Sequence, residues 1–202
     1  KLSHVHCCTS LVYKKNLIKI GEESFRVFNT GSPSYANIDS IKKINIQKLL
    51  SKLNIRNTNK KYLILIKHPL SSEIDQSYIQ MKKSLEAIKF FCLKNNFNTV
   101  CIAPNSDPGS YEIVKAVKEY INEEWFNYLE TLPRLDFINL IRNASALVGN
   151  SSMGLLEAPH YKLPVVNIGK RQLGRLNAGN VQFTNYSKSK IIKELEKACF
   201  DK

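Results

Sequence analysis

The sequence has no long hydrophobic run, and this absence argues against a membrane span. Its 202 residues are 43% hydrophobic, with a mean hydropathy of −0.26, and no apolar stretch approaches the roughly 18 residues that cross a bilayer. Residues 1–10 also lack a basic segment followed by an apolar segment and a small-residue cleavage site. We therefore predict neither a membrane partner nor a secretory signal, and the chain begins as the middle of a protein would.

Acidic residues are scarce. The chain has 17 Asp and Glu residues and 30 Lys and Arg residues, which gives a formal net charge of +13. Such an excess is typical of nucleic-acid-binding proteins, in which clustered Lys and Arg bind phosphates through counterion release. Here the lysines are scattered along predicted helices, without an arginine-rich run or interleaved aromatic residues. The charge therefore does not predict nucleic acid as a partner.

Paired cysteines are also missing. The cysteines are odd in number and show no Cys-x-x-Cys spacing. Because most lie in apolar contexts, we expect buried, free thiols in a protein of the reducing cytoplasm. The histidines His4, His6 and His160 have neither metal-ligand spacing nor an evident acidic partner, so no metal site and no cofactor are predicted. The five cysteines are Cys7, Cys8, Cys92, Cys101 and Cys199.

The first 36 residues predict a strand, a helix and a second strand. A short, partly apolar strand at 4–10 precedes apolar residues at helical spacing, which end at Gly21, a residue type that often stops helices. The segment 26–33 is β-prone and ends in turn residues, which suits a strand and then a crossing between domains. We expect residues 1–36 to be the tail of one domain and residues 37–202 to form the next.

After a helical region predicted over 39–53 and a polar linker at 56–60, strands and helices alternate regularly. Several strands are apolar throughout, which is typical of a parallel sheet covered by helices on both faces. The predicted fold class is α/β, with a Rossmann-like parallel sheet. The predicted strands are 62–66, 99–103, 126–129, 146–149 and 165–168, and the predicted helices are 75–93, 111–120, 135–142, 154–160 and 187–198.

The strongest motif is Gly-Asn-Ser-Ser-Met-Gly at 149–154, between a predicted apolar strand and a predicted helix. Ligands of such sheets bind beyond the carboxyl ends of the strands. Small residues there let a ligand approach the backbone, N–H groups at a helix start favour a phosphate, and the hydroxyls of Ser151 and Ser152 can add hydrogen bonds. Serine is also a common helix cap, so the motif alone leaves both interpretations open. It is neither a Walker A loop nor a G-x-G-x-x-G fingerprint.

Four further residues lie at or near predicted strand ends, and each has an ordinary structural alternative. Glu157 could reach a ribose beside the phosphates, or it is a favourable acid near a helix start. Arg171 carries a forked guanidinium that suits phosphate or uracil contacts, although surface arginines are common. His68 is a candidate acid–base group, but a lone histidine is more often structural. Asn105 could bond a base or ribose, but it lies among turn-forming residues.

In this order and spacing the motifs resemble the hydrolysing UDP-N-acetylglucosamine 2-epimerases of sialic-acid and related nonulosonic-acid pathways. The resemblance runs through nearly the whole chain. Its most specific parts are the segment 149–154 and the Asn-Ile-Gly-Lys-Arg-Gln-Leu-Gly-Arg segment at 167–175. The other matching pieces are residues 1–4, 27–33, 68–69 and 104–107.

The resemblance implies two Rossmann-like domains in the arrangement of the B-type glycosyltransferases (GT-B), with the sugar nucleotide in the cleft. This chain would be the second, UDP-binding domain with the tail of the first, and the missing N-terminal domain would be its partner. The serines would bind the phosphates, Glu157 the ribose, and His68 would lie closest to the diphosphate of the UDP-sugar substrate. The family's UDP contacts carry over to His68, Asn105, Ser151, Ser152, Glu157 and Arg171.

The implied reaction removes the C2 proton, expels UDP to leave a glycal, and adds water to yield N-acetylmannosamine. The acid–base carboxylates belong to the family's first domain, so His68, which could help to neutralise the departing UDP, is the one catalytic candidate here. The alternatives are a GT-B glycosyltransferase, a non-hydrolysing epimerase, which the segment 167–175 disfavours, and a non-catalytic UDP-sugar-binding module. The choice between N-acetylglucosamine and its 2,4-diacetamido relative stays open, as does a homo-oligomeric state.

Overall fold

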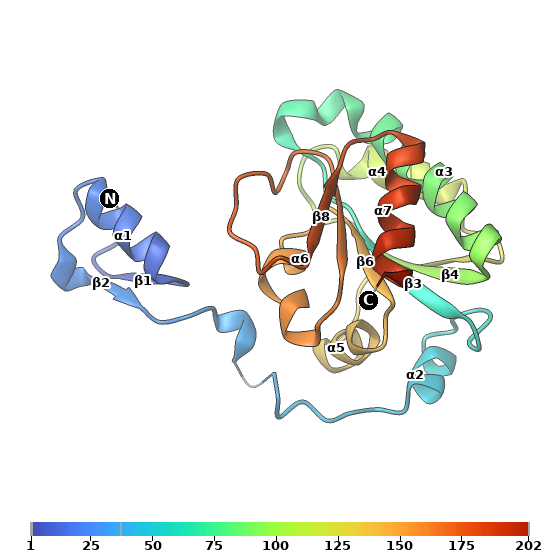
Figure 1. The fold of residues 1–202 in the computed structure, drawn as a ribbon, viewed down its shortest axis with the longest axis horizontal. Coiled ribbons are helices and arrows are strands. Elements are labelled where there is room, and N and C mark those ends of the chain that lie inside the picture. Colours follow the sequence, from blue (N-terminus) through green and yellow to red (C-terminus); the bar gives the residue numbers. More distant parts are fainter. Residues whose placement is uncertain (1, 37, 202) are drawn as a thin grey trace. The chain divides into compact units, whose positions relative to one another are not determined.

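Strands alternate with helices along almost the whole chain, as the sequence predicts (Figure 1). The computed structural model describes residues 2–36 and 38–201. Its internal contacts separate residues 1–41 from residues 42–202, so the chain consists of two units. Within the described residues, no helix is both long enough and apolar enough to cross a bilayer.

The first unit contains two parallel strands joined by a helix, which confirms the predicted strand, helix and strand. Its elements are β1 (His6–Cys8), α1 (Leu11–Lys19) and β2 (Val27–Asn29), with 3-10 turns at Ser24–Arg26 and Pro33–Tyr35. The Ser10 hydroxyl caps α1 by accepting the Tyr13 N–H at 3.3 Å. After the helix, Gly21 turns the chain with a φ of 96°, a value that glycine adopts without a Cβ clash.

A buried carboxylate connects β1 with the turn that precedes β2. Nε2 of His6 lies 3.1 Å from Oε2 of Glu22, and Nη2 of Arg26 lies 2.5 Å from the same oxygen. Since Glu22 is only 5% exposed, its charge needs such partners. The expectation that His6 has no acidic partner is therefore wrong. The helix α1 returns the chain to β1, and this return brings together two residues that are 16 positions apart.

Six parallel strands form the sheet of the second unit. They are β3 (Lys61–Ile66), β4 (Phe97–Ile102), β5 (Phe126–Leu129), β6 (Ala146–Gly149), β7 (Val165–Ile168) and β8 (Val181–Thr184). Their order across the sheet is β5-β4-β3-β6-β7-β8, and each neighbouring pair is parallel. The predicted parallel α/β sheet is confirmed. The sequence predicts every strand except β8, which is a partly exposed edge strand without a continuous apolar run.

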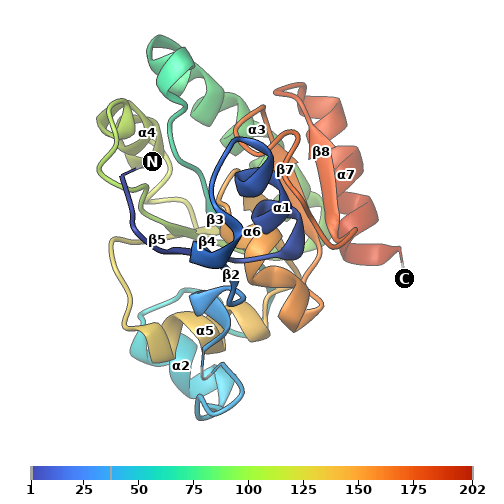
Figure 2. The same ribbon diagram turned by 90° about the vertical axis from the view of Figure 1, so that its left-hand side faces the viewer.

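Helices cover both faces of this sheet. One face carries α3 (Ser77–Asn95), α4 (Ser110–Lys118) and α7 (Lys188–Phe200), and the other carries α2 (Ile46–Lys52), α5 (Arg134–Arg142) and α6 (Met153–Leu156). In both views α3 lies beside α7, and α2 lies beside α5 (Figures 1 and 2). Along β3, Leu63 and Leu65 pack on the first face, whereas Ile64 and Ile66 pack on the second. Burial on both faces explains why residues 62–66 of β3 and the whole of β6 are apolar.

The helix predicted over 39–53 forms only in its second part, as α2. The residues before it are held by Asn139 of α5, whose side chain accepts the Ile44 N–H at 2.9 Å and donates to the Lys42 carbonyl at 2.9 Å. Because these hydrogen bonds occupy backbone groups that a longer helix would use, the chain stays irregular here. The helix then begins after Asn45, whose side chain caps it.

The helix predicted over 154–160 is also shorter than expected. The α-helix α6 ends at Leu156, and a 3-10 turn follows at Ala158–Tyr161. Pro159 has no N–H group to donate, so the α-helical hydrogen bonding cannot continue through it. Lys162 then adopts a left-handed φ of 53°, which turns the chain toward β7.

All five cysteines are free thiols. Cys8, Cys92 and Cys101 are buried as expected, and burial raises the pKa of the Cys92 thiol to about 12. Cys199 is half-buried, and Cys7 is exposed, which corrects the expectation of burial for that residue. Neighbouring residues of a strand point to opposite sides, so β1 buries Cys8 and exposes Cys7.

The chain reverses its direction across the sheet beside β3. It adds β4 and β5 on one side of β3 and then returns to place β6, β7 and β8 on the other side. The carboxyl ends of β3 and β6 thus meet at the topological switch point, where sheets of this kind bind ligands. Gly149, the last residue of β6, runs so close to β3 that a Cβ there would lie 2.0 Å from the carbonyl oxygen of Ile66.

We expect Gly149→Ala to lower the free energy of unfolding by about 3 kcal/mol or more, because the clash is with backbone and no side-chain rotation relieves it. Gly174→Ala is the matched control. Gly174 also has a positive φ, 76°, but no atom lies within 4 Å of its added Cβ, so backbone strain of about 1–2 kcal/mol is the whole expected loss. Urea denaturation followed by circular dichroism measures both variants, and equal losses would show that space at Gly149 is not limiting.

Candidate functional site

A buried asparagine at the switch point forms the centre of the candidate site. Asn150 follows β6 directly and is 2% exposed. Its side-chain oxygen accepts the His68 N–H at 2.7 Å, and its side-chain nitrogen donates to the His68 carbonyl at 2.8 Å. Its own N–H donates to the Ile66 carbonyl at 3.0 Å. One amide therefore ties the loop after β3 to the loop after β6, much as a further pair of sheet hydrogen bonds would.

His68 lies half-buried at this junction, as expected for a residue that follows β3. Its Nδ1 accepts the backbone N–H of Asn105 at 3.0 Å, so the neutral ring carries its proton on Nε2. Burial lowers the pKa of His68, and the positive charge of Arg171 lowers it further. The imidazole is therefore a neutral ring near pH 7, with Nε2–H as its donor.

Arg171 is brought to the same turn from the loop after β7. Its Nη1 donates to the carbonyl oxygen of Asn150 at 3.2 Å, and Nε2 of Gln172 donates to that oxygen at 2.9 Å. Nη1 of Arg175 in turn donates to Oε1 of Gln172 at 2.7 Å. Three side chains of the predicted segment 167–175 thus form a connected network on the turn after β6.

The two serines occupy the connection between β6 and α6, and both are half-buried. The hydroxyl of Ser151 accepts the Met153 N–H at 3.3 Å, which is a capping contact. Ser152 stands at the N-cap position of α6 without a side-chain capping bond. Among the described residues, the structure records no acceptor for the backbone N–H groups of Ser151 and Ser152. The capping interpretation therefore applies to Ser151, and two N–H donors remain for a ligand.

Asn105 and Glu157 stand somewhat apart from this centre. The backbone of Asn105 contacts His68, but its exposed side chain donates to the carboxylate of Asp107, as the turn interpretation predicts. Glu157 is half-buried and lies at the end of α6 rather than on its first turn. Of the predicted site residues, four are therefore brought together around Asn150, and these are His68, Ser151, Ser152 and Arg171.

Asn150 and Lys67 were not among the predicted site residues, although Asn150 anchors the switch point and Lys67 directly precedes His68. Lys67 follows β3 directly and is only 2% exposed. Its Nζ lies 5.1 Å from the centre of the Tyr186 ring. Burial lowers the pKa of Lys67 to about 8, with Arg171 lowering it further and Glu73 opposing both. The sequence does contain a signal for Lys67, because this lysine directly continues the apolar run 62–66. Lysine is rarely buried in such a position unless it has a partner.

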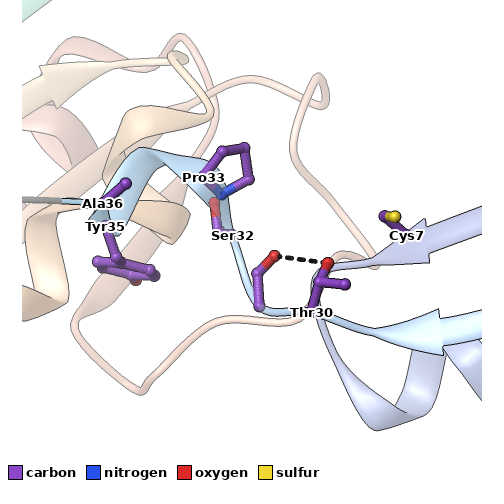
Figure 3. A pocket seen from close by; sticks show the side chains of 7 residues that line it. Cys7, Thr30, Ser32, Pro33, Tyr35 and Ala36 are labelled. Carbon is purple, nitrogen blue, oxygen red and sulfur yellow. Dashed lines mark hydrogen bonds between the residues drawn. The ribbon is translucent and has the colours of Figure 1, made fainter.

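The described residues form several open pockets away from the switch point. One, of about 640 Å³ in the first unit, has Cys7 near one end and Tyr35 and Ala36 near the other (Figure 3). Another, of about 540 Å³, lies at the carboxyl ends of β7 and β8 and includes Lys170. The described residues contain no group of three or more His, Cys, Asp or Glu side chains that could hold a metal ion.

Comparison with known proteins gives consistent matches. A family model described as UDP-N-acetylglucosamine 2-epimerase matches residues 1–202. The chain is 34% identical to a polysialic acid biosynthesis protein of Escherichia coli, over 96% of this chain and 48% of that protein. It is 32% identical to the UDP-N,N'-diacetylbacillosamine 2-epimerase (hydrolyzing) of Legionella pneumophila, over 98% of this chain and 51% of that protein. The chain thus spans about half the length of the curated relatives it matches.

Solved structures support the fold. The UDP-GlcNAc 2-epimerase of Neisseria meningitidis, solved with UDP-GlcNAc bound, matches with a TM-score of 0.76 and 19% identity. The match covers 97% of this chain and 53% of that chain. At this identity the likeness concerns the fold alone, and it confirms the predicted class: a Rossmann-like half of a GT-B-type arrangement.

We expect the His68 imidazole to titrate below its ordinary range, and Arg171→Ala to raise its pKa, because a nearby positive charge disappears. Titration of the imidazole Hε1 resonance by NMR measures this pKa. Arg175→Ala is the matched control, since it removes a charge from the same loop that does not act on His68. An equal His68 pKa in the wild type and Arg171→Ala would contradict the electrostatic coupling.

Proposed function

The chain belongs to the UDP-N-acetylglucosamine 2-epimerase family, and from that premise we propose that it is the UDP-binding half of a hydrolysing member of this family. The complete protein would convert UDP-N-acetylglucosamine and water to N-acetylmannosamine and UDP, the first step of sialic- or nonulosonic-acid synthesis. Similarity to a hydrolysing diacetylbacillosamine 2-epimerase and to a polysialic acid biosynthesis protein supports the hydrolysing branch. The similarity to the diacetylbacillosamine enzyme makes a 2,4-diacetamido sugar on UDP the alternative substrate.

The observation that carries this proposal is the convergence of anion-binding groups at the switch point. A guanidinium, a neutral imidazole and two free backbone N–H groups lie around the turn after β6. Such donors suit a diphosphate, because charge-assisted hydrogen bonds to phosphate oxygens are among the strongest in proteins. We assign the diphosphate to Ser151, Ser152 and Arg171, the ribose to Glu157, and a further nucleoside contact to Asn105.

His68 has a specific role in this proposal. Because the Asn105 N–H occupies Nδ1, the Nε2–H of His68 is the donor that remains for the diphosphate. Elimination of UDP from C1 develops negative charge on a phosphate oxygen, and a hydrogen bond to that oxygen stabilises the leaving group. His68 would thus assist departure as a neutral donor, while the carboxylates that move the C2 proton would come from the partner domain.

The first unit supports the proposed missing domain. None of the residues of α1 is buried, and two strands with one helix bury too little apolar surface to be stable alone. We propose that residues 1–36 complete a larger Rossmann-like sheet, from which the chain crosses to the UDP-binding domain. The apolar side chains that this sheet would cover are Leu2, Val5, Leu11, Val12, Ile18, Ile20, Phe25 and Phe28.

The five free thiols suit a cytoplasmic protein. Disulfides persist in oxidising compartments and are rare where glutathione keeps thiols reduced. Cys7 and Cys8 are adjacent on β1, and neither forms a disulfide. We therefore propose the cytoplasm as the compartment of the complete enzyme.

Replacing Ser151 and Ser152 together with alanine should weaken UDP binding by about 1–3 kcal/mol, because two hydrogen bonds to a charged ligand are lost. Isothermal titration calorimetry measures the change. Ser51→Ala on the exposed face of α2 removes a hydroxyl far from the switch point and should leave the affinity unchanged. Equal UDP affinity in the double variant and the wild type would show that the two serine hydroxyls do not bind the nucleotide.

The 202-residue chain alone should bind UDP weakly and release no N-acetylmannosamine from UDP-N-acetylglucosamine, because it supplies one wall of the cleft and no acid–base pair for C2. Proton NMR of the reaction mixture follows free sugar and UDP together. Release of N-acetylmannosamine by this chain would contradict the assignment. Transfer of the sugar to an added acceptor by the complete protein would favour the GT-B glycosyltransferase, and UDP binding without turnover by the complete protein would favour a non-catalytic module.

A further inference from the structure

Lys67 lies at the carboxyl end of β3, beside the candidate site, and the proposed function gives it no role. It continues the strand after Ile66 and directly precedes His68. Strand alternation places it on the same face as Leu63 and Leu65, which pack against α3 and α7. With 2% of its surface exposed, it is one of the largest fully buried side chains among the described residues.

A buried ammonium is costly unless it is paired, and this one has poor pairing. Among the described residues, the structure gives Nζ of Lys67 no hydrogen-bond acceptor, and its closest recorded partner is the ring of Tyr186 at 5.1 Å. The acid whose charge acts on Lys67, Glu73, is already engaged by other groups. Its carboxylate accepts a hydrogen bond from Nε2 of Gln80 at 2.7 Å and lies 3.6 Å from Nζ of Lys170.

The surrounding charges make the position still less favourable for a cation. Arg171 lowers the pKa values of both Lys67 and His68, and Lys67 itself lowers that of His68. Lys67 and His68 follow β3 and Arg171 follows β7, so groups that can carry positive charge come together from two strand ends. At Lys67, the negative charge of Glu73 is the one that offsets them. An arrangement of like charges costs stability, and a bound anion relieves that cost.

We propose that Lys67 is an anion-binding residue of the UDP site, whose ammonium offsets the charge of the nucleotide diphosphate at the junction of β3 and β6. This inference rests on the proposed function. It assigns to a fixed side chain the charge neutralisation that a divalent cation supplies in many phosphate sites. The ring of Tyr186 stabilises the ammonium through a cation–π contact before the nucleotide arrives.

The proposal predicts that UDP affinity falls as the pH rises from 7 to 9. Lys67, with a pKa lowered to about 8, is mostly charged at pH 7 and mostly neutral at pH 9. His68 is neutral across this range, Arg171 stays charged, and the pKa of Tyr186 is raised by burial, so Lys67 is the group that titrates. A bound diphosphate favours the ammonium, and binding at pH 8 should therefore take up about half a proton.

Calorimetry with UDP and with uridine tests the proposal on the 202-residue chain. Lys67→Met keeps the length of the apolar stem and removes the charge. We expect it to weaken UDP binding about tenfold or more at pH 7, to abolish the fall toward pH 9, and to leave uridine binding within about twofold. Lys61→Met, at the exposed amino end of the same strand, is the matched control and should bind UDP as the wild type does.

Stability separates this role from a structural one. The pKa of Lys67 is lowered by folding, so the unfolded chain binds its proton more tightly and the buried charge destabilises the fold at pH 7. Lys67→Met should therefore raise the Tm by a few degrees at pH 7 while it weakens UDP binding. A lysine that serves only the fold would lower the Tm when replaced.

The possible outcomes distinguish this inference from the proposed function. Equal UDP affinity and pH dependence in Lys67→Met, with weakened binding in the Ser151 and Ser152 double variant, would overturn the role of Lys67 alone. No UDP binding by the wild type would overturn both proposals. If Lys67→Met does not fold, proton uptake by the wild type, measured in buffers of different ionisation enthalpy at pH 8, decides the question, and zero uptake overturns the inference.

Discussion

The candidate site depends on one buried amide. Asn150 bonds both backbone groups of His68 across the switch point, and its own carbonyl holds Arg171 and Gln172. The loops that follow β3, β6 and β7 therefore share one anchor. The bare backbone of Gly149 permits this arrangement, because only a residue without Cβ lets β6 approach β3 so closely at its end.

The electrostatics of the site follow from that geometry. Asn150 holds Arg171 close to Lys67 and His68 at the carboxyl edge of the sheet. Sheets of this kind bind their ligands at that edge. The helix α6 has only four residues, so its dipole is small. In the proposed UDP site, the two free N–H groups and the side-chain cations would therefore supply most of the attraction for a phosphate. Burial lowers the pKa of both Lys67 and His68.

The sequence predicts the strands well where burial is complete. The strands β5, β6 and β7 have the predicted bounds, and β6 and β7 are buried along their whole length. It fails where tertiary contacts override local preference. The side chain of Asn139 prevents a helix before residue 46, and the edge strand β8 lacks an apolar run. The site residues were predictable as strand-end motifs, but the central role of Asn150 depends on a contact with a residue 82 positions away.

The strand order also bears on how the molecule folds. Residues 61–129 supply β3, β4 and β5 as one contiguous half of the sheet, and residues 146–184 supply the other half. Each half forms through contacts close in sequence, whereas pairing of β3 with β6 closes a long loop and is intrinsically slower. We expect this seam to be completed late, and a nucleotide bound there, as proposed, would stabilise the last step of folding.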